Sequence, residues 1–363
     1  MNRLLKAAAL ALTLVAAASP TTADAQQTRR LNADKSNDYG VVYRLPQTGV
    51  EITANATRTV SKAGPFYQYA AKFIGTDKVV REDETRWTLD NLSTAVYGVA
   101  DPDESYVLQV KPGSSVSISV ADDGMLLGIN TDAEPPYRPT AYKPALPKEN
   151  TKPIDEYLKF VDEDFLACQS TYKQAEMLAA ALMEIREARI SLTRGTAETM
   201  PTDGRQLELM LASLQDQEDA IKRAFTGETI TDSYTRTYLV MPEEEGEQIV
   251  FRFSEFDGFV EADDLSGEPV NMDLRIVSEP ETPLDVKGEP KKLPKDAVVY
   301  NIPATARVTL THDGRKMVQK NYGFGQFGTT FGLQPTLFSD KKEPYRATFT
   351  PADGALLRLE PLQ

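Results

Sequence analysis

The side chains that most often carry catalysis or bind metals are scarce in this 363-residue sequence, which has one histidine and one cysteine. His312 lies in THDGR, where Asp-Gly favours a tight hairpin turn, and Cys168 lies just before a helical pattern. Zinc sites built on several His or Cys ligands are therefore excluded. A lone cysteine forms no internal disulfide, and a Cys–His dyad would require two distant segments to meet. We expect Cys168 to be a small buried apolar residue and predict no catalytic residue, no metal site and no cofactor.

Sequence motifs for nucleotide binding or acyl transfer give no support for an enzyme. The chain has no GxxxxGK[ST] phosphate loop and no GxSxG nucleophile elbow. The segment YGFGQFG at 322–328 is rich in glycine and aromatic residues, but it lacks a phosphate-binding lysine at the right place. We expect packing and turn geometry to explain this segment.

Carboxylates remain as candidates for chemistry, and they are densest in FSEFDGFVEADDLSGEP at 253–269. A glycosidase needs two carboxyls across a cleft, and a calcium site needs several oxygens on one loop. The cluster does not match the twelve-residue calcium loop, and a solvated hairpin loop is the simpler interpretation. Trp87, the only tryptophan, could stack on a sugar ring, although a buried core aromatic is commoner. The possible ligand or partner surface therefore comprises Trp87, Asp257, Glu261, Asp263 and Asp264.

The composition limits the class of protein. The net charge is −14 at pH 7, so nucleic-acid phosphates and anionic lipid surfaces repel the chain, and we exclude nucleic-acid binding. With 41% hydrophobic residues the chain has enough apolar material for folded cores, and its length fits two or three domains.

The first 25 residues have the pattern of a secretory signal peptide, with a basic start, an apolar run at 7–18 and small residues before Gln26. Twelve apolar residues are too few for a stable membrane span, and no later stretch approaches twenty, so we predict no transmembrane anchor. We expect the cleaved chain to begin at Gln26 and to be a periplasmic or extracellular protein.

Strand and helix patterns predict a mainly β protein with a central α-helical hairpin, α+β overall. The predicted segments are a signal peptide (1–25), an N-terminal β domain (26–132), a proline-rich linker (133–153), a helical hairpin region (154–229), central strands (230–279) and a C-terminal β domain (280–363).

The helical hairpin is predicted over 171–226, where apolar residues recur at spacings of three and four. Thr171 and Gln174 form a candidate capping box at its start. Each helix has one charged residue on its apolar face, Arg189 and Glu218. We assume that the end of the first helix and the start of the second lie at the same height along the hairpin axis. At 1.5 Å per residue, Arg189 and Glu218 are then about 13 Å apart along this axis, so we predict no direct ion pair.

A short sequence segment of the N-terminal β domain recurs in the C-terminal β domain, and we call each such matched segment a phrase. VVYRLPQT at 41–48 and VVYNIPAT at 298–305 share five of eight residues. Two further pairs follow in order, namely 66–73 with 324–331 and DGMLL at 123–127 with DGALL at 353–357. We predict two related β-sandwich-like domains that arose by internal duplication, the first longer by 27 residues that include Trp87. The alternative is convergence on a common strand–proline–turn sequence.

Several phrases together resemble a family of exported proteins of Bacteroidota, domain-of-unknown-function family 4831. They are VVYRLP, GPFYQYAAKFIG, DDGMLLGIN, REARISLTRG with PTDGRQLELML, AFTGE, FRFSE and DDLSGEPV. The resemblance covers 39–359, and the order and spacing of the phrases carry it. It implies an envelope location in a Gram-negative bacterium and no activity.

The sequence favours a non-enzymatic envelope protein that binds a protein or glycan partner through its β domains. One alternative is a carboxylate-based glycan-processing hydrolase, which requires two carboxyls about 5–10 Å apart in a hollow. The other is a structural subunit of a cell-surface assembly, which requires an exposed apolar stripe on the helical hairpin. The sequence does not specify the oligomeric state.

Overall fold

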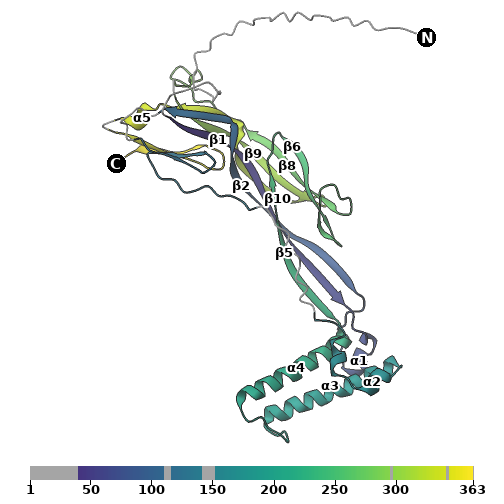
Figure 1. Cartoon of the computed structure of the whole chain (residues 1–363). Coiled ribbons are helices and arrows are strands. Elements are labelled where there is room, and N and C mark those ends of the chain that lie inside the picture. Colours follow the sequence, from purple (N-terminus) through teal and green to yellow (C-terminus); the bar gives the residue numbers. More distant parts are fainter. Residues whose placement is uncertain (1–39, 110–115, 141–151, 295–296, 341–342, 363) are drawn as a thin grey trace, which may run out of the picture.

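The computed structural model describes residues 40–109, 116–140, 152–294, 297–340 and 343–362, and the predicted signal peptide lies outside these ranges. The molecule has three parts, which we call the body, the stalk and the tip (Figure 1). The body consists of β-sheets, the stalk is a long ribbon of strands that leaves the body, and the tip is a helical unit at the far end of the stalk. The prediction of a mainly β protein with a helical hairpin is confirmed.

The strands are β1 (Gly40–Lys62), β2 (Glu84–Gln109), β3 (Ile118–Val120), β4 (Leu126–Ile129), β5 (Glu228–Val240), β6 (Gly246–Ser254), β7 (Gly258–Val260), β8 (Glu268–Ser278), β9 (Val298–His312), β10 (Arg315–Leu333), β11 (Tyr345–Phe349) and β12 (Leu356–Pro361). The longer helices are α3 (Thr171–Arg194) and α4 (Gly204–Thr226). The short ones are η1 (Tyr67–Tyr69), α1 (Ala70–Phe73), η2 (Glu156–Phe160), α2 (Glu163–Ala167) and α5 (Thr336–Ser339).

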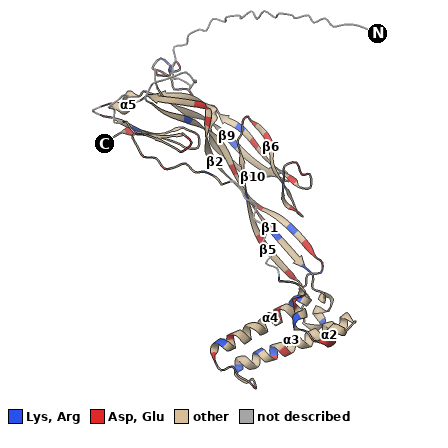
Figure 2. Cartoon of the chain, in the orientation of Figure 1, with Lys and Arg blue, Asp and Glu red and all other residues tan. Residues whose placement is uncertain are grey.

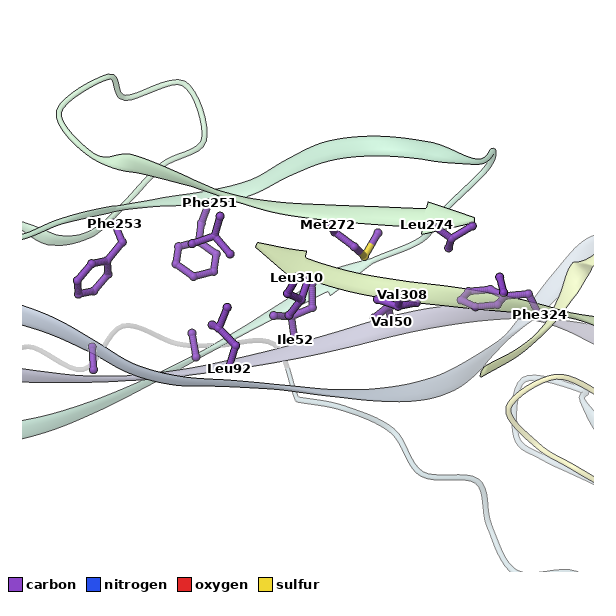
Figure 3. Packing of buried hydrophobic residues seen from close by; sticks show 14 residues of the cluster. Val50, Ile52, Leu92, Phe251, Phe253, Met272, Leu274, Val308, Leu310 and Phe324 are labelled. Atoms are coloured by element: carbon purple, nitrogen blue, oxygen red, sulfur yellow. The ribbon is translucent and has the colours of Figure 1, made fainter. Parts of the chain in front are cut away.

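Two antiparallel sheets enclose the main core of the body. One has the order β2-β1-β5 and the other β10-β9-β8-β6-β7. Alternate residues of β1, among them Val50 and Ile52, face Met272 of β8 and Leu310 of β9 across this core (Figure 3). Because side chains alternate along a strand, this burial directs the intervening residues of β1 away from the core.

The third sheet mixes segments that are distant in the sequence. Its order is β12-β11-β4-β3, so strands from the predicted N-terminal and C-terminal β domains hydrogen-bond to each other. The same segments share a second core, which includes Tyr43, Leu126, Val298 and Phe349. The domain boundaries in the sequence therefore do not separate independent units in space.

The stalk is the part of the β2-β1-β5 sheet that continues beyond the body (Figure 1). β1 pairs with β5 from Val50 to Lys62 and with β2 as far as Ser61, so three strands run side by side to the tip. The loop after β1 forms the two short helices η1 and α1.

The tip consists of the α3–α4 hairpin, η2, α2 and the η1–α1 loop, packed around Phe66, Phe165, Leu182 and Phe225. Ser170 caps α3 by accepting a hydrogen bond from the Lys173 N–H, so the predicted capping box at Thr171 is displaced by one residue. The Gln174 side chain instead donates to the carbonyl of Cys168 at 2.8 Å.

Candidate functional site

The predicted ligand surface lies where the stalk leaves the body. Trp87 of β2 is half-buried there, with its ring centroid 4.8 Å from that of Tyr234 and 6.5 Å from that of Phe259. Gly258 lies against the indole ring, where an added Cβ would approach within 2.7 Å of Cδ2. Trp87 is thus in contact with the β6–β7 turn on one face and with the stalk on the other, and packing accounts for its surroundings.

The four predicted acidic residues, Asp257, Glu261, Asp263 and Asp264, are all exposed on the two loops beside β7. Asp264 accepts a hydrogen bond from the Ser266 N–H at 2.9 Å, and this bond lowers the pKa of its carboxyl. The Asp257 carboxylate lies 3.4 Å from the Ser254 hydroxyl. The structure brings Asp257 next to Gly258 and thereby near Trp87, while the other three occupy the β7–β8 loop. Their role as a partner surface stays a prediction.

The repeated phrase forms the junction of the two long hairpins, β1–β2 and β9–β10. The Arg44 N–H donates to the Gly124 carbonyl at 2.8 Å, and the Asn301 N–H donates to the Gly354 carbonyl at 3.1 Å. Arg44 and Asn301 occupy the same place in the two copies of the phrase. Gly124 and Gly354 both adopt positive φ, at 88° and 74°.

The second predicted pair of phrases is not equivalent in the structure. Phe66 precedes η1 at the tip, whereas Phe324 lies in β10, opposite Ala304 of β9. The two hairpins share a different feature, which is a four-residue bulge in the returning strand. Residues 101–104 bulge opposite Leu45, and residues 325–328 bulge opposite Pro303.

The second bulge contains Gln326, a residue that motif searching missed. Its side-chain amide accepts from the Thr48 N–H at 2.8 Å and donates to the Thr48 carbonyl at 2.9 Å, as a neighbouring strand would. The Thr48 hydroxyl, itself buried, donates to Ala352 and accepts from Gly325. GFGQFG has the spacing of a dinucleotide fingerprint, but it lies within β10 and is not followed by a helix, so packing explains it.

Tyr43 of the first phrase is fully buried in the same junction. Its hydroxyl donates to the Val299 carbonyl at 3.2 Å and accepts from the Val299 N–H at 2.8 Å. Burial raises the pKa of this hydroxyl well above its usual range. The group therefore stays protonated and ties the two copies of the phrase together.

Glu218 of α4 is buried in the tip and meets three cations. Its carboxylate lies 3.0 Å from Arg186, 2.8 Å from Arg189 and 2.7 Å from Lys222. The prediction that Arg189 and Glu218 do not pair is wrong, because it assumed that the two helices are level.

The connection at 195–203 staggers the helices. Leu192, two residues before the end of α3, lines the same hollow as Leu214, ten residues into α4. The start of α4 therefore extends past the end of α3, and Glu218 lies level with the arginines of α3.

The far half of the hairpin exposes apolar side chains on both of its helices. Met183 and Ile190, seven residues apart on one side of α3, are each 46% exposed, and Leu209 of α4 is 62% exposed. A hollow of about 530 Å³ lies at this half of the hairpin, and its lining includes the apolar side chains of Leu192 and Met210 together with several Ser and Thr residues. The buried core of the tip includes none of these residues, since it is confined to the half nearer the stalk.

A second hollow, of about 500 Å³, lies in the body between the 285–294 loop and the end of β10. Asp285 and Glu289 line it, together with Lys291 and Lys292. Asp285 already accepts hydrogen bonds from the Lys287 and Glu289 N–H groups at 2.8 and 3.0 Å, which fix the turn. This carboxylate serves the loop and gives the hydrolase alternative no specific support.

His312 and Cys168 lie in different parts of the molecule. His312 ends β9 in the body, where Asp313 and Gly314 form the predicted tight turn with positive φ. Cys168 follows α2 in the tip and is half-buried. Within the described ranges no three His, Cys, Asp or Glu side chains gather as a metal site would require. Nor does any helix there have the length and apolarity of a membrane span.

Fold and site together define a mainly β protein that carries a helical tip on a stalk. The family model for the domain of unknown function DUF4831 matches residues 39–357, and the chain belongs to this family. Searches of curated proteins and of solved structures gave no match.

Proposed function

We propose that this protein is an exported, non-enzymatic binding protein of the envelope of a Gram-negative bacterium, and that its tip docks a protein partner. One observation carries the proposal: the far half of the α3–α4 hairpin exposes apolar side chains on both helices while the stalk holds it away from the body (Figure 1). Exposed apolar groups on a projecting helix pair are typical of recognition surfaces.

Charge does not suggest a different kind of partner. Acidic and basic residues alternate along the body, the stalk and the tip without a large region of one sign (Figure 2). The partner surface therefore depends on apolar contacts at the tip, where Ile190 and Leu209 are the natural anchors.

The test is a pull-down from envelope fractions with mass spectrometry, using the full chain and two single variants of the tip, Ile190→Lys and Leu209→Lys. We expect one partner to be captured by the wild type and lost with either variant. Val286→Lys in the body is the matched control, because Val286 is fully exposed far from the tip. A partner captured equally by all four proteins would contradict docking at the tip.

Export is tested separately by cell fractionation and N-terminal sequencing. We expect the protein in the periplasm or at the cell surface, with Gln26 as its first residue. A cytoplasmic protein that retains residues 1–25 would contradict this part of the proposal.

The proposal includes an internal duplication of a β-sandwich-like unit. Three features support it: the matched hydrogen bonds of Arg44 and Asn301, the four-residue bulge in each hairpin, and the matching strand orders β2-β1-β5 and β10-β9-β8. In each trio the first strand of the hairpin is central. An experimental structure in which the two trios do not superpose would contradict the duplication.

A further inference from the structure

The face of the stalk sheet that points away from the core has an unusual composition. Residues that pair directly across strands lie on the same face of a sheet. Five consecutive rungs on this face are Ser93–Thr53–Thr237, Asn91–Asn55–Thr235, Thr88–Thr57–Ser233, Arg86–Thr59–Thr231 and Glu84–Ser61–Thr229, read from β2 through β1 to β5. Thirteen of these fifteen residues are Ser, Thr or Asn. We call them the hydroxyl face.

The hydroxyl face has few charged residues. Arg86 and Glu84 lie at the end nearest the tip and pair with each other at 3.0 Å. Asp90, in the β2 bulge between the second and third rungs, accepts a hydrogen bond from the Thr57 hydroxyl at 2.7 Å. The paired residues of the first three rungs, which begin behind the main core of the body, carry no charge, and the Asp90 carboxylate lies beside the third rung. At the body end, the Tyr137 hydroxyl donates to Glu51 at 3.1 Å and bounds the face.

A second exposed sheet face in the body shows that a high threonine content does not by itself explain the small number of charged residues on the hydroxyl face. The outward rungs of β8, β9 and β10 are Asn271–Thr311–Lys316, Asp273–Thr309–Gln319 and Arg275–Arg307–Asn321, and four of these nine residues are charged. Both faces belong to regular antiparallel sheets in the same protein. High β-propensity of threonine therefore accounts for the strands but not for the small number of charged residues on the hydroxyl face.

Hydrogen bonds hold part of the hydroxyl face in a fixed arrangement. The Thr235 hydroxyl donates to Asn55 at 2.7 Å, and the Asn55 amide donates to Asn91 at 3.0 Å, so the second rung is linked across all three strands. The β5 residues at the open edge, from Thr229 to Thr235, are exposed on this side. The Thr229 hydroxyl lies 3.3 Å from that of Ser61, and each of these exposed hydroxyl oxygens can still accept a hydrogen bond from a ligand.

The dimensions of the hydroxyl face fit a polymer. Rungs two residues apart repeat at about 6.7 Å, so five rungs extend over about 27 Å, while three strands span only about 10 Å. A long, narrow array of donors and acceptors with few charges complements a chain-like ligand that is itself rich in hydroxyls. Because each such contact competes with water, binding depends on many contacts made together.

We propose that the hydroxyl face of the stalk binds a neutral polysaccharide chain along its length. A second copy of this protein is a poorer occupant, because the face has no large apolar or aromatic side chain to anchor a protein interface. Two such faces would also bury hydroxyls that each need a partner. The proposal is independent of protein docking at the tip.

The test is affinity electrophoresis of the full chain in gels that contain amylose, laminarin or galactomannan, with polyanionic alginate for comparison. We expect at least one neutral polysaccharide to retard the wild type. The triple variant Thr231→Val, Thr235→Val, Thr237→Val should bind at least tenfold more weakly, because valine keeps the shape of threonine and removes its hydroxyl. The matched control, Thr305→Val, Thr309→Val, Thr311→Val, changes three outward threonines of β9 and should bind within twofold of the wild type.

Circular dichroism establishes that both triple variants are folded, and an alanine series at 231, 235 and 237 replaces the valine series if either aggregates. The proposal is overturned if no neutral polysaccharide retards the wild type, if alginate alone does, or if the stalk variant binds like the control. Sedimentation equilibrium provides the remaining check. A dimer that the stalk variant abolishes would assign the face to a second copy instead.

Discussion

At the scale of single residues, the junction of the two hairpins depends on glycines and partly buried polar side chains at its closest contacts. Gly328 packs against β9 so tightly that an added Cβ would lie 2.2 Å from the Ile302 carbonyl oxygen. Asp353 is partly buried beside Gly323 and accepts a hydrogen bond from the Ala355 N–H at 3.0 Å. The close contacts of these residues position Gln326 to form its two hydrogen bonds with the backbone of Thr48.

We expect Gly328→Ala to lower the free energy of unfolding by about 1–3 kcal/mol, because backbone atoms of β9 cannot move away from the new methyl group independently. Urea denaturation measures the change. Gly204→Ala is the matched control, since nothing lies within 4 Å of its added Cβ. The control should be neutral or stabilising by up to about 1 kcal/mol. Equal effects of the two substitutions would contradict the close approach at Gly328.

Asp353 should make stability depend on pH in the direction opposite to most carboxylates. Burial raises its pKa above the usual 3.8, despite a hydrogen bond from the Ala355 N–H that lowers it. Its contribution to stability is therefore fully present below about pH 3.8 and is lost as the pH rises through the raised, folded-state pKa.

The variant Asp353→Asn should not show this loss. The free energy of unfolding of the variant, relative to that of the wild type, should therefore increase as the pH rises from 4 to 7. Urea denaturation across this range measures the difference. Asp123→Asn is the comparison, because Asp123 occupies the same place in the first copy but pairs with Arg138 at 2.5 Å. The Asp123 variant should lose stability near pH 7. A pH-independent difference between wild type and Asp353→Asn would refute the assignment.

At the scale of elements, the ion cluster around Glu218 stabilises the staggered packing of the two helices of the tip. Glu218 has its pKa lowered in the folded state: burial alone raises it, but hydrogen bonds from Lys222 and Arg186 and the charges of Lys222 and Arg189 outweigh burial. The cluster therefore stabilises the hairpin above the unfolded pKa near 4.5 and stops doing so as the pH falls through the lower, folded pKa.

We expect Glu218→Gln to destabilise the hairpin by about 1–3 kcal/mol at pH 7, because three cations lose a buried anionic partner. Thermal unfolding followed by circular dichroism at the helical band is the measurement. Glu208→Gln, at an exposed position of the same helix, should change little. If the two variants melt alike at pH 7, the cluster does not hold the stagger.

At the scale of the whole molecule, burial is distributed unevenly along the long axis. The body has two buried cores, and the tip has one that stops halfway along the hairpin. Regions with few buried apolar contacts open most easily. The far half of the hairpin should therefore open more easily than the half nearer the stalk.

Hydrogen exchange should show this gradient directly. We expect amides of α3 beyond Met183 and of α4 before Leu214 to exchange faster than those of Ala175–Leu182 and Ala220–Phe225. Strands β8 and β9 in the body should be the slowest. Uniform protection along both helices would contradict a core confined to the half nearer the stalk.

The sequence by itself determined the features that depend on neighbours in the chain. Apolar spacing predicted both long helices, and Asp313-Gly314 predicted its hairpin turn. The match of Tyr43 with Tyr300 also marked two strands that occupy corresponding places. These conclusions follow from local periodicity and turn preferences, which act over a few residues.

Only the tertiary structure decided which distant residues share a surface. The stagger that pairs Glu218 with Arg189 depends on the path of the 195–203 connection, and sequence spacing does not specify that path. The mixing of β4 with β11 and the alignment of Thr59 with Thr231 depend on strand register between segments more than 170 residues apart. Register is set by burial of the opposite face, so the hydroxyl face emerges only when three strands are placed side by side.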